Sequence, residues 1–409
     1  MTVLQDCRSR EKLVVVGAGM AATRFVEELT KRAPGRYDIL VIGDEPRPAY
    51  NRVLLSSVLA GELSVDDIEL KPSQWWRVAG IEVLSGRKVI KINAAARRLL
   101  LDNGESVDYS KLVLATGSRA ARLPIEGADL PGVHTFRDVQ DVEALSQLGK
   151  GKRALVIGGG LLGLEAAYGL ARRGVDVTLA HVMERLMERQ LDAAGADILR
   201  RLVEEKGVRV LLNANATRIS GSGRVENVEF ADGRTVPADA VIFAVGIRPN
   251  ADLARQAGLD VRRGVIVDDG LKTSEAGVFA IGECAEHRGV CYGLVEPAYE
   301  QGRVLAMRLA GQDASYGGSV VSTNLKVSGV RVFSAGDYLG EGDARRIVCK
   351  DPRMGIYRKL VVRDDRLVGA ILIGDTSGAA DLLDLIRSGA DISSQRDELM
   401  FGAPLQEAA

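Results

Sequence analysis

The chain has 409 residues, long enough for two or three domains with substantial cores. Its 46% apolar and 27% charged residues are typical of a globular protein, and a net charge of −1 indicates neither a nucleic-acid-binding nor an anionic-membrane-binding surface. No apolar run approaches the roughly 18 residues of a membrane-spanning helix, and the N-terminus lacks the apolar core of a signal peptide, so we expect no membrane association and a cytoplasmic location.

The first ordered pattern lies near the N-terminus. The sequence predicts a strand over residues 13–16, a glycine-rich turn GAGMAA at 17–22 and a helix to about Lys31. The Pro-Gly pair at 34–35 ends this helix, and a second parallel strand is predicted at 37–42.

The same plan recurs in the middle of the chain. A strand at 153–157, a turn GGGLLG at 158–163, a helix to about Arg173 and a strand at 175–180 follow one another in the same order. Further strand-like segments lie at 112–117, 208–213, 239–246 and 277–285.

The last hundred residues have a different character. After a helix predicted at 297–310, the pattern changes near 311–318. The segment 356–374 predicts an antiparallel hairpin that turns at Asp364–Asp365, and an amphipathic helix is predicted at 379–387. These elements indicate a separate α+β domain, in which we find no catalytic motif.

The first glycine turn has the residues that a dinucleotide site requires. Gly17 permits the sharp turn, Gly19 lets the backbone approach a pyrophosphate, and Ala22 keeps helix and strand close. An acid at the end of the second strand would accept hydrogen bonds from a ribose. Asp44 and Glu45 are both candidates, and the sequence does not decide between them.

The second glycine turn repeats this arrangement with Gly158, Gly160 and Gly163. One such turn would be weak support for a dinucleotide site, but two in tandem indicate two dinucleotides. Glu165 is placed by the pattern in the first turn of the helix. It is either an acid that interacts with the helix macrodipole or a residue near a nicotinamide.

The second strand of this repeat ends without an acid. His181 stands where an acid that selects NADH is expected, and Arg185 could assist a 2′-phosphate. Alternatively, His181 is merely a surface residue. The loop therefore leaves both NADH and NADPH open. If it does contact the 2′ position, His181→Glu should raise the preference for NADH by charge repulsion.

The tandem turns resemble those of the two-dinucleotide flavoprotein reductases. Residues 112–118 and 244–250 match the family's two crossover strands, and 273–285 matches its late flavin motif, in which an acid, here Glu283, binds the ribityl chain. The text DEPRPAYNRVLLSS at 44–57 is similar to the flavin-containing part of assimilatory nitrite and nitrate reductases.

This resemblance implies an α/β fold with two Rossmann-like dinucleotide-binding domains, the FAD domain being interrupted by the NAD(P) domain, and a C-terminal α+β domain. The implied boundaries are 1–118 and 247–313 for FAD, 119–246 for NAD(P)H, and 314–409 for a dimerisation or acceptor-docking domain. The implied cofactors are FAD and NADH, with NADPH left open, and no metal.

Family contacts, carried over residue by residue, add further sites. The resemblance places Arg52 and Ser57 in the loop after the first ribose acid, Val89 in the strand beside the adenine, Arg137 at the domain junction, and Val295 just before the helix that faces the isoalloxazine. With Glu165 as the one candidate on the nicotinamide side, the other predicted cofactor-binding residues are Gly17, Gly19, Met20, Ala21, Ala22, Asp44, Glu45, Thr116, Gly117, Gly158, Gly160, Leu161, Leu162, Gly163, His181, Gly246, Gly282 and Glu283.

The cysteines distinguish among the chemistries of such reductases. The first helix and the loop at 51–62 contain no cysteine, which disfavours dithiol and peroxide chemistry. Cys7, Cys284, Cys291 and Cys349 include no C-x-x-C pair, so with three histidines we expect neither a disulfide framework nor a metal site. We expect Cys284 to pack beside the flavin motif.

The remaining mechanism is hydride transfer from nicotinamide to flavin, which requires no protein acid or base. The chain ends before any cysteine cluster for an iron–sulfur centre, so the resemblance predicts a module that passes electrons to a separate acceptor: an iron–sulfur, sirohaem, molybdenum nitrate reductase or rubredoxin-type protein. Alternatives are a rubredoxin or ferredoxin reductase, an NADH-responsive redox sensor and a disulfide or peroxide reductase. A homodimer is left open.

Overall fold

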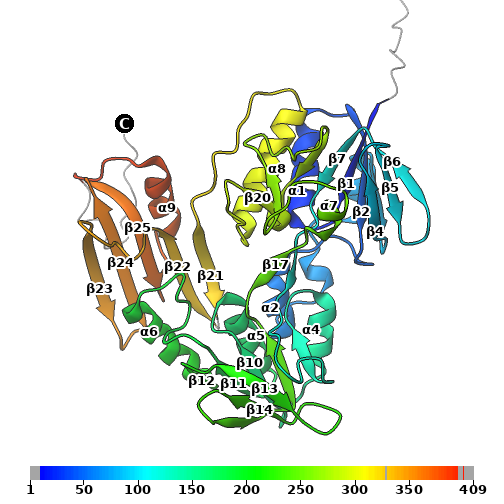
Figure 1. Cartoon of the computed structure of the whole chain (residues 1–409). Coiled ribbons are helices and arrows are strands. Elements are labelled where there is room, and N and C mark those ends of the chain that lie inside the picture. The colour runs from blue at the N-terminus through cyan, green and yellow to red at the C-terminus, as the bar shows by residue number, and fades with distance from the viewer. Residues whose placement is uncertain (1–9, 328, 395–398, 400–409) are drawn as a thin grey trace, which may run out of the picture. The chain divides into compact units, whose positions relative to one another are not determined.

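The computed structural model describes residues 10–327, 329–394 and 399. These residues form two compact units, each assembled from separate stretches of the chain (Figure 1). The first unit contains the described residues up to Val53, Val65–Arg119 and Ile247–Ser319. The second contains Leu54–Ser64, Ala120–Gly246 and the described residues from Val320 onward.

The predicted α/β class is confirmed by these units. The four-segment division of the sequence stays a prediction, because the two units group the chain differently. The short stretch Leu54–Ser64 and the C-terminal segment both belong to the unit that contains Ala120–Gly246.

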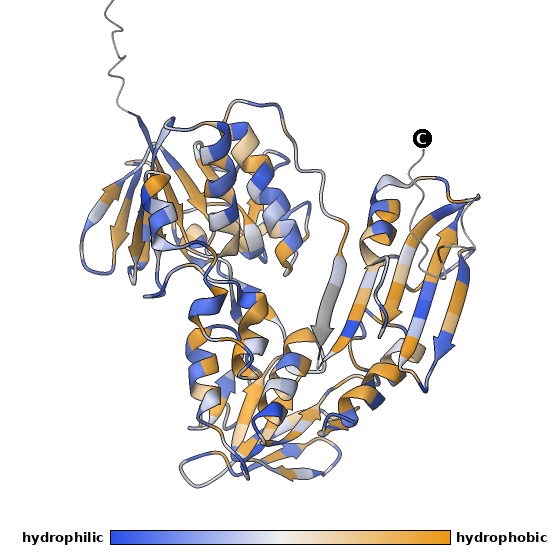
Figure 2. Ribbon diagram, turned by 180° about the vertical axis from the view of Figure 1, so that it is seen from behind, coloured by the Kyte–Doolittle hydropathy of each residue, from blue (hydrophilic) through white to orange (hydrophobic). Residues whose placement is uncertain are grey.

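A five-stranded parallel sheet forms the core of the first unit. Its strands, in spatial order, are β19 (Val278–Ala280), β7 (Lys111–Leu114), β1 (Glu11–Val16), β2 (Tyr37–Gly43) and β3 (Ile81–Ser85). Residues 13–16 of the central strand are buried, as expected for a parallel sheet covered on both faces. Figure 2 shows the sheet strands as largely hydrophobic.

Two helices of this unit, α1 (Met20–Arg32) and α8 (Val295–Leu309), pack closely against each other. A Cβ atom added at Gly302 would lie 3.2 Å from the backbone nitrogen of Phe25, so a glycine at this point permits the close contact. The shorter helices and 3-10 turns of the unit are η1 (Arg52–Leu54), η2 (Asp66–Ile68), α3 (Ser73–Val78), α7 (Asp252–Gln256) and η3 (Gly282–Cys284).

Smaller sheets surround this core. An antiparallel sheet contains β4 (Val89–Asn93), β5 (Arg98–Leu101) and β6 (Ser106–Asp108). Two further pairs are β18 (Val265–Val267) with β20 (Ala285–His287), and β8 (Ser118–Ala120) with β17 (Ile247–Pro249).

The second unit contains another five-stranded parallel sheet. Its strands, in spatial order, are β12 (Val208–Leu211), β11 (Asp176–Ala180), β10 (Arg153–Ile157), β16 (Ala240–Phe243) and β9 (Val133–Thr135). Its helices are α2 (Leu55–Leu59), α4 (Val139–Ser146), α5 (Leu161–Arg172) and α6 (Ala193–Glu204). A small antiparallel sheet contains β13 (Ala216–Ser220), β14 (Asn227–Phe230) and β15 (Thr235–Pro237).

The C-terminal part of the second unit is an antiparallel sheet with one helix packed on it. The strands, in spatial order, are β21 (Ser322–Val327), β22 (Val330–Gly336), β25 (Arg366–Ile373), β24 (Ile356–Arg363) and β23 (Arg345–Asp351), and the helix is α9 (Ala379–Ser388). The hairpin turn predicted at Asp364–Asp365 is confirmed, and both residues have positive φ, 49° and 52°.

Candidate functional site

The first glycine turn lies where three strands of the first unit end. Gly17 has φ 108°, and a Cβ atom there would lie 2.1 Å from the carbonyl oxygen of Ala115, just after β7. Its N–H donates to the carbonyl oxygen of Ile42 in β2, at 2.7 Å. Only glycine fits this position, so the turn is fixed at the carboxyl edge of the sheet, where open α/β sheets bind ligands.

The space above this turn is open. A Cβ atom added at Gly19 would have no neighbour within 4 Å, which leaves room for a ligand to approach the backbone. Gly19 is the N-cap of α1, and Met20 and Ala21 are the first residues of that helix, where the N–H groups have no partner within the helix. A pyrophosphate therefore fits this turn. Ala22 is buried against the core.

The late motif comes close to this turn. A Cβ atom at Gly282 would lie 2.9 Å from the Cβ atom of Ala21, and the Gly282 N–H donates to Oε1 of Gln301 at 2.7 Å. Glu283 accepts a hydrogen bond from Ser118 Oγ at 2.7 Å. Gln301 is only 1% exposed, and the sequence analysis missed it. A lone glutamine on the apolar face of α8 was the available signal.

The two crossover segments are tied together by a second residue that the sequence analysis missed. Thr116 Oγ1 donates to the carbonyl oxygen of Asn250 at 2.7 Å, and Asn250 Nδ2 donates to the carbonyl oxygen of Thr116 at 2.9 Å. Asn250 also donates its N–H to the carbonyl oxygen of Gly117, which has φ 63°. The reciprocal bonds hold Thr116 and Gly117 beside the glycine turn.

The two candidate ribose acids have different surroundings. Asp44 is exposed just after β2, whereas Glu45 accepts a hydrogen bond from Tyr50 Oη at 2.7 Å and pairs with Arg52. Arg52 lies in the short helix η1, not in an open loop as expected. Val89 is buried in β4, as part of the hydrophobic core.

The second glycine turn has the same construction. Gly158 has φ 123°, and a Cβ atom there would lie 2.3 Å from the Ala244 carbonyl oxygen. The Gly158 N–H donates to the carbonyl oxygen of Ala180 at 2.8 Å. A Cβ atom at Gly163 would lie 1.8 Å from the carbonyl oxygen of Gly158, whereas one at Gly160 would meet nothing within 4 Å. Open space again faces the N-terminus of α5, whose first residues are Leu161 and Leu162.

The placement of Glu165 in the first helical turn is wrong. The helix begins at Leu161 and has no acid in its first turn, and Glu165 lies farther along it with only 7% of its surface exposed. Burial raises the pKa of Glu165 from its ordinary value of 4.5 to about 8. The carboxyl group is therefore protonated at neutral pH, which removes the macrodipole interpretation.

The interpretation of His181 as a surface residue is also wrong. The residue is only 6% exposed, because its ring packs on the second glycine turn. Nδ1 accepts a hydrogen bond from the Gly159 N–H at 3.0 Å, and Nε2 lies 3.0 Å from Oε2 of Glu188. The nearby Arg185 pairs with Glu184 at 2.8 Å.

The remaining predicted contacts stay predictions. Ser57 lies in α2, not in a loop, and belongs to the second unit. Val295 is the first residue of α8 and does not precede it. Arg137 lies just before α4, where its N–H donates to Asp141 at 2.7 Å. Gly246 has φ 104°, and a Cβ atom there would meet nothing within 4 Å.

The cysteines that the structure describes are all free. Cys284, a residue of the late motif, is completely buried, and burial raises the pKa of its thiol. Such a thiol is a poor nucleophile. Cys291 is half-buried, and Cys349 is exposed on β23. Cys7 lies outside the described residues.

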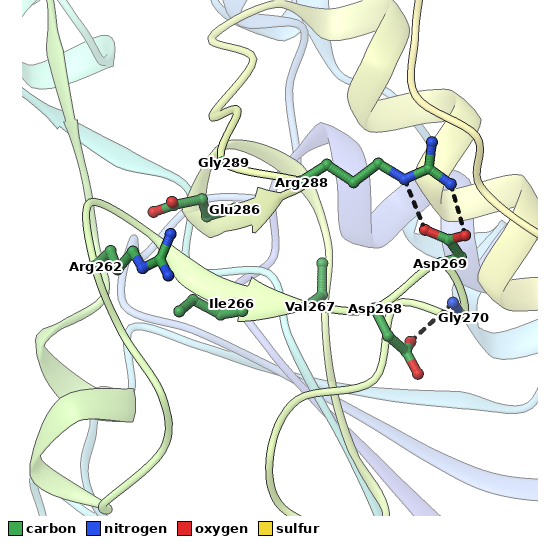
Figure 3. Close-up of a pocket in the computed structure, with 9 residues that line it drawn as sticks. All are labelled: Arg262, Ile266, Val267, Asp268, Asp269, Gly270, Glu286, Arg288 and Gly289. Carbon is green, nitrogen blue, oxygen red and sulfur yellow. Dashed lines mark hydrogen bonds and ion pairs between the residues drawn. The ribbon is translucent and has the colours of Figure 1, made fainter.

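A pocket of about 540 Å³ in the first unit lies apart from these motifs (Figure 3). Arg262, Glu286 and Arg288 line it, and Arg288 pairs with Asp269 across its rim at 2.7 Å. None of the site residues predicted from the sequence lines this pocket. Charges of both signs are mixed in it, so it does not fit a single anionic ligand.

The described part of the chain contains neither a metal-binding cluster of side chains nor a membrane-spanning helix. Within residues 10–327, 329–394 and 399, no cluster of three or more histidine, cysteine or acidic side chains could hold a metal ion. Within the same residues, no helix has both the length and the apolar character needed to cross a bilayer.

The two glycine turns, each with open space at a helix N-terminus, define a protein that binds two dinucleotides. Residues 11–302 match the family described as "Pyridine nucleotide-disulphide oxidoreductase". Residues 322–390 match the family described as "Rubredoxin NAD+ reductase C-terminal domain". The chain belongs to the pyridine nucleotide-disulphide oxidoreductase family. It is an oxidoreductase, and the expected cofactors, FAD and NAD(P)H, are those of this family.

Individual relatives agree with this assignment. The chain is 44% identical over 402 residues to a nitrite reductase [NAD(P)H] of Bacillus subtilis, covering 98% of this chain and 50% of that protein. It is 42% identical over 393 residues to the assimilatory nitrate reductase electron transfer subunit of the same organism, covering 96% and 51%. The chain therefore spans about half the length of these relatives.

A solved structure shows the same fold. In the crystal structure of the covalent putidaredoxin reductase–putidaredoxin complex, a chain matches with a TM-score of 0.85 and 27% identity, covering 94% of each chain. The resemblance stated from the sequence is thus confirmed.

Proposed function

We propose that the chain passes electrons from NAD(P)H through FAD to a separate redox protein, as the electron-transfer component of assimilatory nitrite or nitrate reduction. The single observation that carries this proposal is the pair of glycine turns, each open at its second glycine. Hydride transfer from NAD(P)H to FAD requires a binding site for each of these two dinucleotides. The names of the two Bacillus subtilis relatives support the acceptor class.

The residues of the first unit fit FAD. Gly19 and the N-terminus of α1 would hold its pyrophosphate, Asp44 its adenosine ribose, and Glu283 its ribityl chain. Bound there, FAD supplies the ability to take up a hydride and to release two electrons singly. Ser118 fixes the Glu283 carboxylate, and Gln301 fixes the backbone beside it.

The residues of the second unit would hold the nicotinamide dinucleotide. Gly160 and the N-terminus of α5 fit its pyrophosphate. Glu165, protonated at neutral pH, brings no charge to the nicotinamide side and can donate a hydrogen bond. The protein needs to orient the two rings and exclude water, and no acid or base has to exchange a proton during the transfer.

The chemistry can be tested in two anaerobic steps. In the first, the yellow protein is mixed with NADH or NADPH, and rapid bleaching is expected with at least one of them. In the second, the reduced protein is mixed with a sirohaem nitrite reductase module, a molybdenum nitrate reductase, or rubredoxin. Rapid reoxidation by either of the first two supports the proposal. Persistent slow bleaching with a long-wavelength band would instead favour a redox sensor.

A second candidate acceptor is rubredoxin. It is favoured by the match of residues 322–390 to a rubredoxin reductase C-terminal domain. Reoxidation of the reduced protein by rubredoxin alone would select this alternative. Homodimer formation stays a prediction.

A further inference from the structure

The segment 181–192 connects β11 to α6 in the second unit. In a dinucleotide-binding sheet, the residue that follows this strand reaches the adenosine ribose, and an acid there rejects the 2′-phosphate of NADPH. His181 occupies this position, so the usual carboxylate is missing. Another group must meet the ribose if the site is to distinguish NADH from NADPH.

The histidine connects the glycine turn to a carboxylate farther along the segment. Because Nδ1 of His181 accepts the Gly159 N–H at 3.0 Å, the ring proton of the neutral tautomer lies on Nε2. Nε2 therefore donates to Oε2 of Glu188 at 3.0 Å. Two consecutive hydrogen bonds place the Glu188 carboxylate next to the turn that would hold the pyrophosphate.

Packing leaves the ring little freedom. A Cβ atom added at Gly159 would lie 2.6 Å from Cγ of His181 and 2.8 Å from Cδ2 of Leu186. The ring thus lies directly on the backbone of the turn. Glu188, whose side chain is 26% exposed, can meet a ligand while it is still held by the buried histidine.

Residues of the C-terminal part of the second unit also hold this segment. Tyr338 Oη donates to the backbone carbonyl of Glu188 at 3.2 Å. At the end of the segment, Asp192 accepts hydrogen bonds from Tyr357 Oη at 2.7 Å and Lys359 Nζ at 2.9 Å. Tyr357 and Lys359 lie in β24 and are almost completely buried. The segment is therefore positioned by both parts of the second unit.

We propose that Glu188, positioned by His181 and Tyr338, binds the adenosine ribose of the nicotinamide dinucleotide and makes the chain prefer NADH to NADPH. Its carboxylate accepts a hydrogen bond from a 2′-hydroxyl and repels a 2′-phosphate. Arg185, the alternative residue that could contact the 2′ position, already pairs with Glu184. The inference rests on the proposed oxidation of NAD(P)H and names the residue that selects the substrate.

The first experiment compares Glu188→Gln with the matched control Glu205→Gln, an exposed acid at the end of α6 in the same unit. The dissociation constants of NAD⁺ and NADP⁺ for the flavin-loaded protein are measured by calorimetry, and kcat/KM is measured with NADH and NADPH. We expect Glu188→Gln to lower the preference for NADH at least 10-fold, mainly through tighter NADP⁺ binding, and the control to change it less than 2-fold.

Two results would overturn this assignment. One is an unchanged NAD⁺/NADP⁺ ratio in Glu188→Gln. The other is a wild-type preference for NADPH that falls in Arg185→Gln, because Arg185 would then bind the 2′-phosphate. Failure of the proposed function has a different signature, since neither nucleotide would reduce the flavin although both dissociation constants could still be measured.

Tyr338→Phe tests the positioning role of the segment that follows β22. Loss of the hydroxyl should loosen Glu188 and raise KM for NADH and the dissociation constant of NAD⁺ about 3-fold, with kcat unchanged. A merely structural role would lower the melting temperature and leave these binding constants as they are. That second pattern would show that Tyr338 does not position Glu188.

Discussion

The two glycine turns share a backbone and differ in the side chains around it. The Gly17 N–H donates a hydrogen bond to the carbonyl oxygen of Ile42, and the Gly158 N–H donates one to the carbonyl oxygen of Ala180. The residues that follow these two acceptors, Gly43 and His181, therefore occupy equivalent places at the ends of β2 and β11. In the first unit the turn residue is Ala18, and a Cβ atom at Gly43 would lie 2.6 Å from the Ala18 Cβ atom.

In the second unit the small and the large residue exchange places: the glycine is in the turn, and the larger side chain is at the end of the strand. The turn residue is Gly159, which leaves room for the His181 ring. The helix position seven residues after the first glycine also differs, because α1 has Arg24 there and α5 has the buried Glu165. Backbone N–H groups can serve the pyrophosphate in both units, whereas we expect side chains to set the ribose and nicotinamide contacts. The shared turn is therefore constant, and its surroundings are free to diverge.

The largest effect should come from filling either turn. Gly17→Val and Gly158→Val each place a side chain where a Cβ atom would lie 2.1 Å or 2.3 Å from a carbonyl oxygen. We expect Gly17→Val to lose most of its FAD. Gly158→Val should retain FAD and reduce at least 100-fold more slowly with NADH. Flavin absorbance per protein and anaerobic stopped-flow measure the two effects.

The control is Gly149→Val, because a Cβ atom there meets nothing within 4 Å and the residue has no positive φ. It should leave both properties unchanged. If Gly17→Val retained FAD, or if Gly158→Val lost it, the assignment of one cofactor to each turn would be wrong.

The second prediction concerns Glu165, which has no acidic counterpart in α1. Its folded-state pKa of about 8 lies above the ordinary value of 4.5, so the folded protein binds the proton more tightly than the unfolded chain. Stability should therefore be fully present below pH 4.5 and fall as pH rises through the window up to about 8. Each pKa unit corresponds to about 1.4 kcal/mol, so the shift of Glu165 gives an upper bound on the order of 5 kcal/mol.

Glu165→Gln removes this titration. Urea unfolding of the flavin-loaded protein at pH 5.5 and pH 8 should show a smaller loss of stability in the variant than in the wild type. Glu205→Gln, an exposed acid, should keep the wild-type dependence. Equal pH dependence in all three proteins would mean that Glu165 is already ionised at neutral pH.

The third prediction tests whether Gly159 leaves the space that the His181 ring fills. Gly159→Ala should destabilise the second unit by about 1–3 kcal/mol, because the added Cβ atom would lie 2.6 Å from the His181 ring. In the background of His181→Ala, the same substitution should cost less than about 1 kcal/mol. A double-mutant cycle measured by urea unfolding gives the coupling, and additive effects would show that the two residues do not share this space.

The local part of this comparison could be predicted from the sequence. Strand, turn and helix follow from periodicity and glycine spacing over a few residues, and the Asp364–Asp365 turn follows from its own two residues. The burial of His181 could not be predicted, because it depends on packing with Gly159 and Leu186. The same limit applies to contacts such as Lys359 with Asp192, since no local pattern connects residues so distant in the chain.

The smallest predicted effect distinguishes the two acids after β2, a choice that the sequence left open. Asp44 is exposed, whereas Glu45 is engaged by Tyr50 and Arg52, so we expect Asp44 to bind the FAD ribose. Asp44→Asn should weaken FAD binding about 5-fold, as expected for the loss of about 1 kcal/mol of hydrogen bonding. Glu45→Gln should instead lower stability by up to about 1 kcal/mol, through the lost ion pair. Equilibrium dialysis of FAD and urea unfolding separate the two outcomes, and weaker FAD binding in Glu45→Gln alone would reverse the assignment.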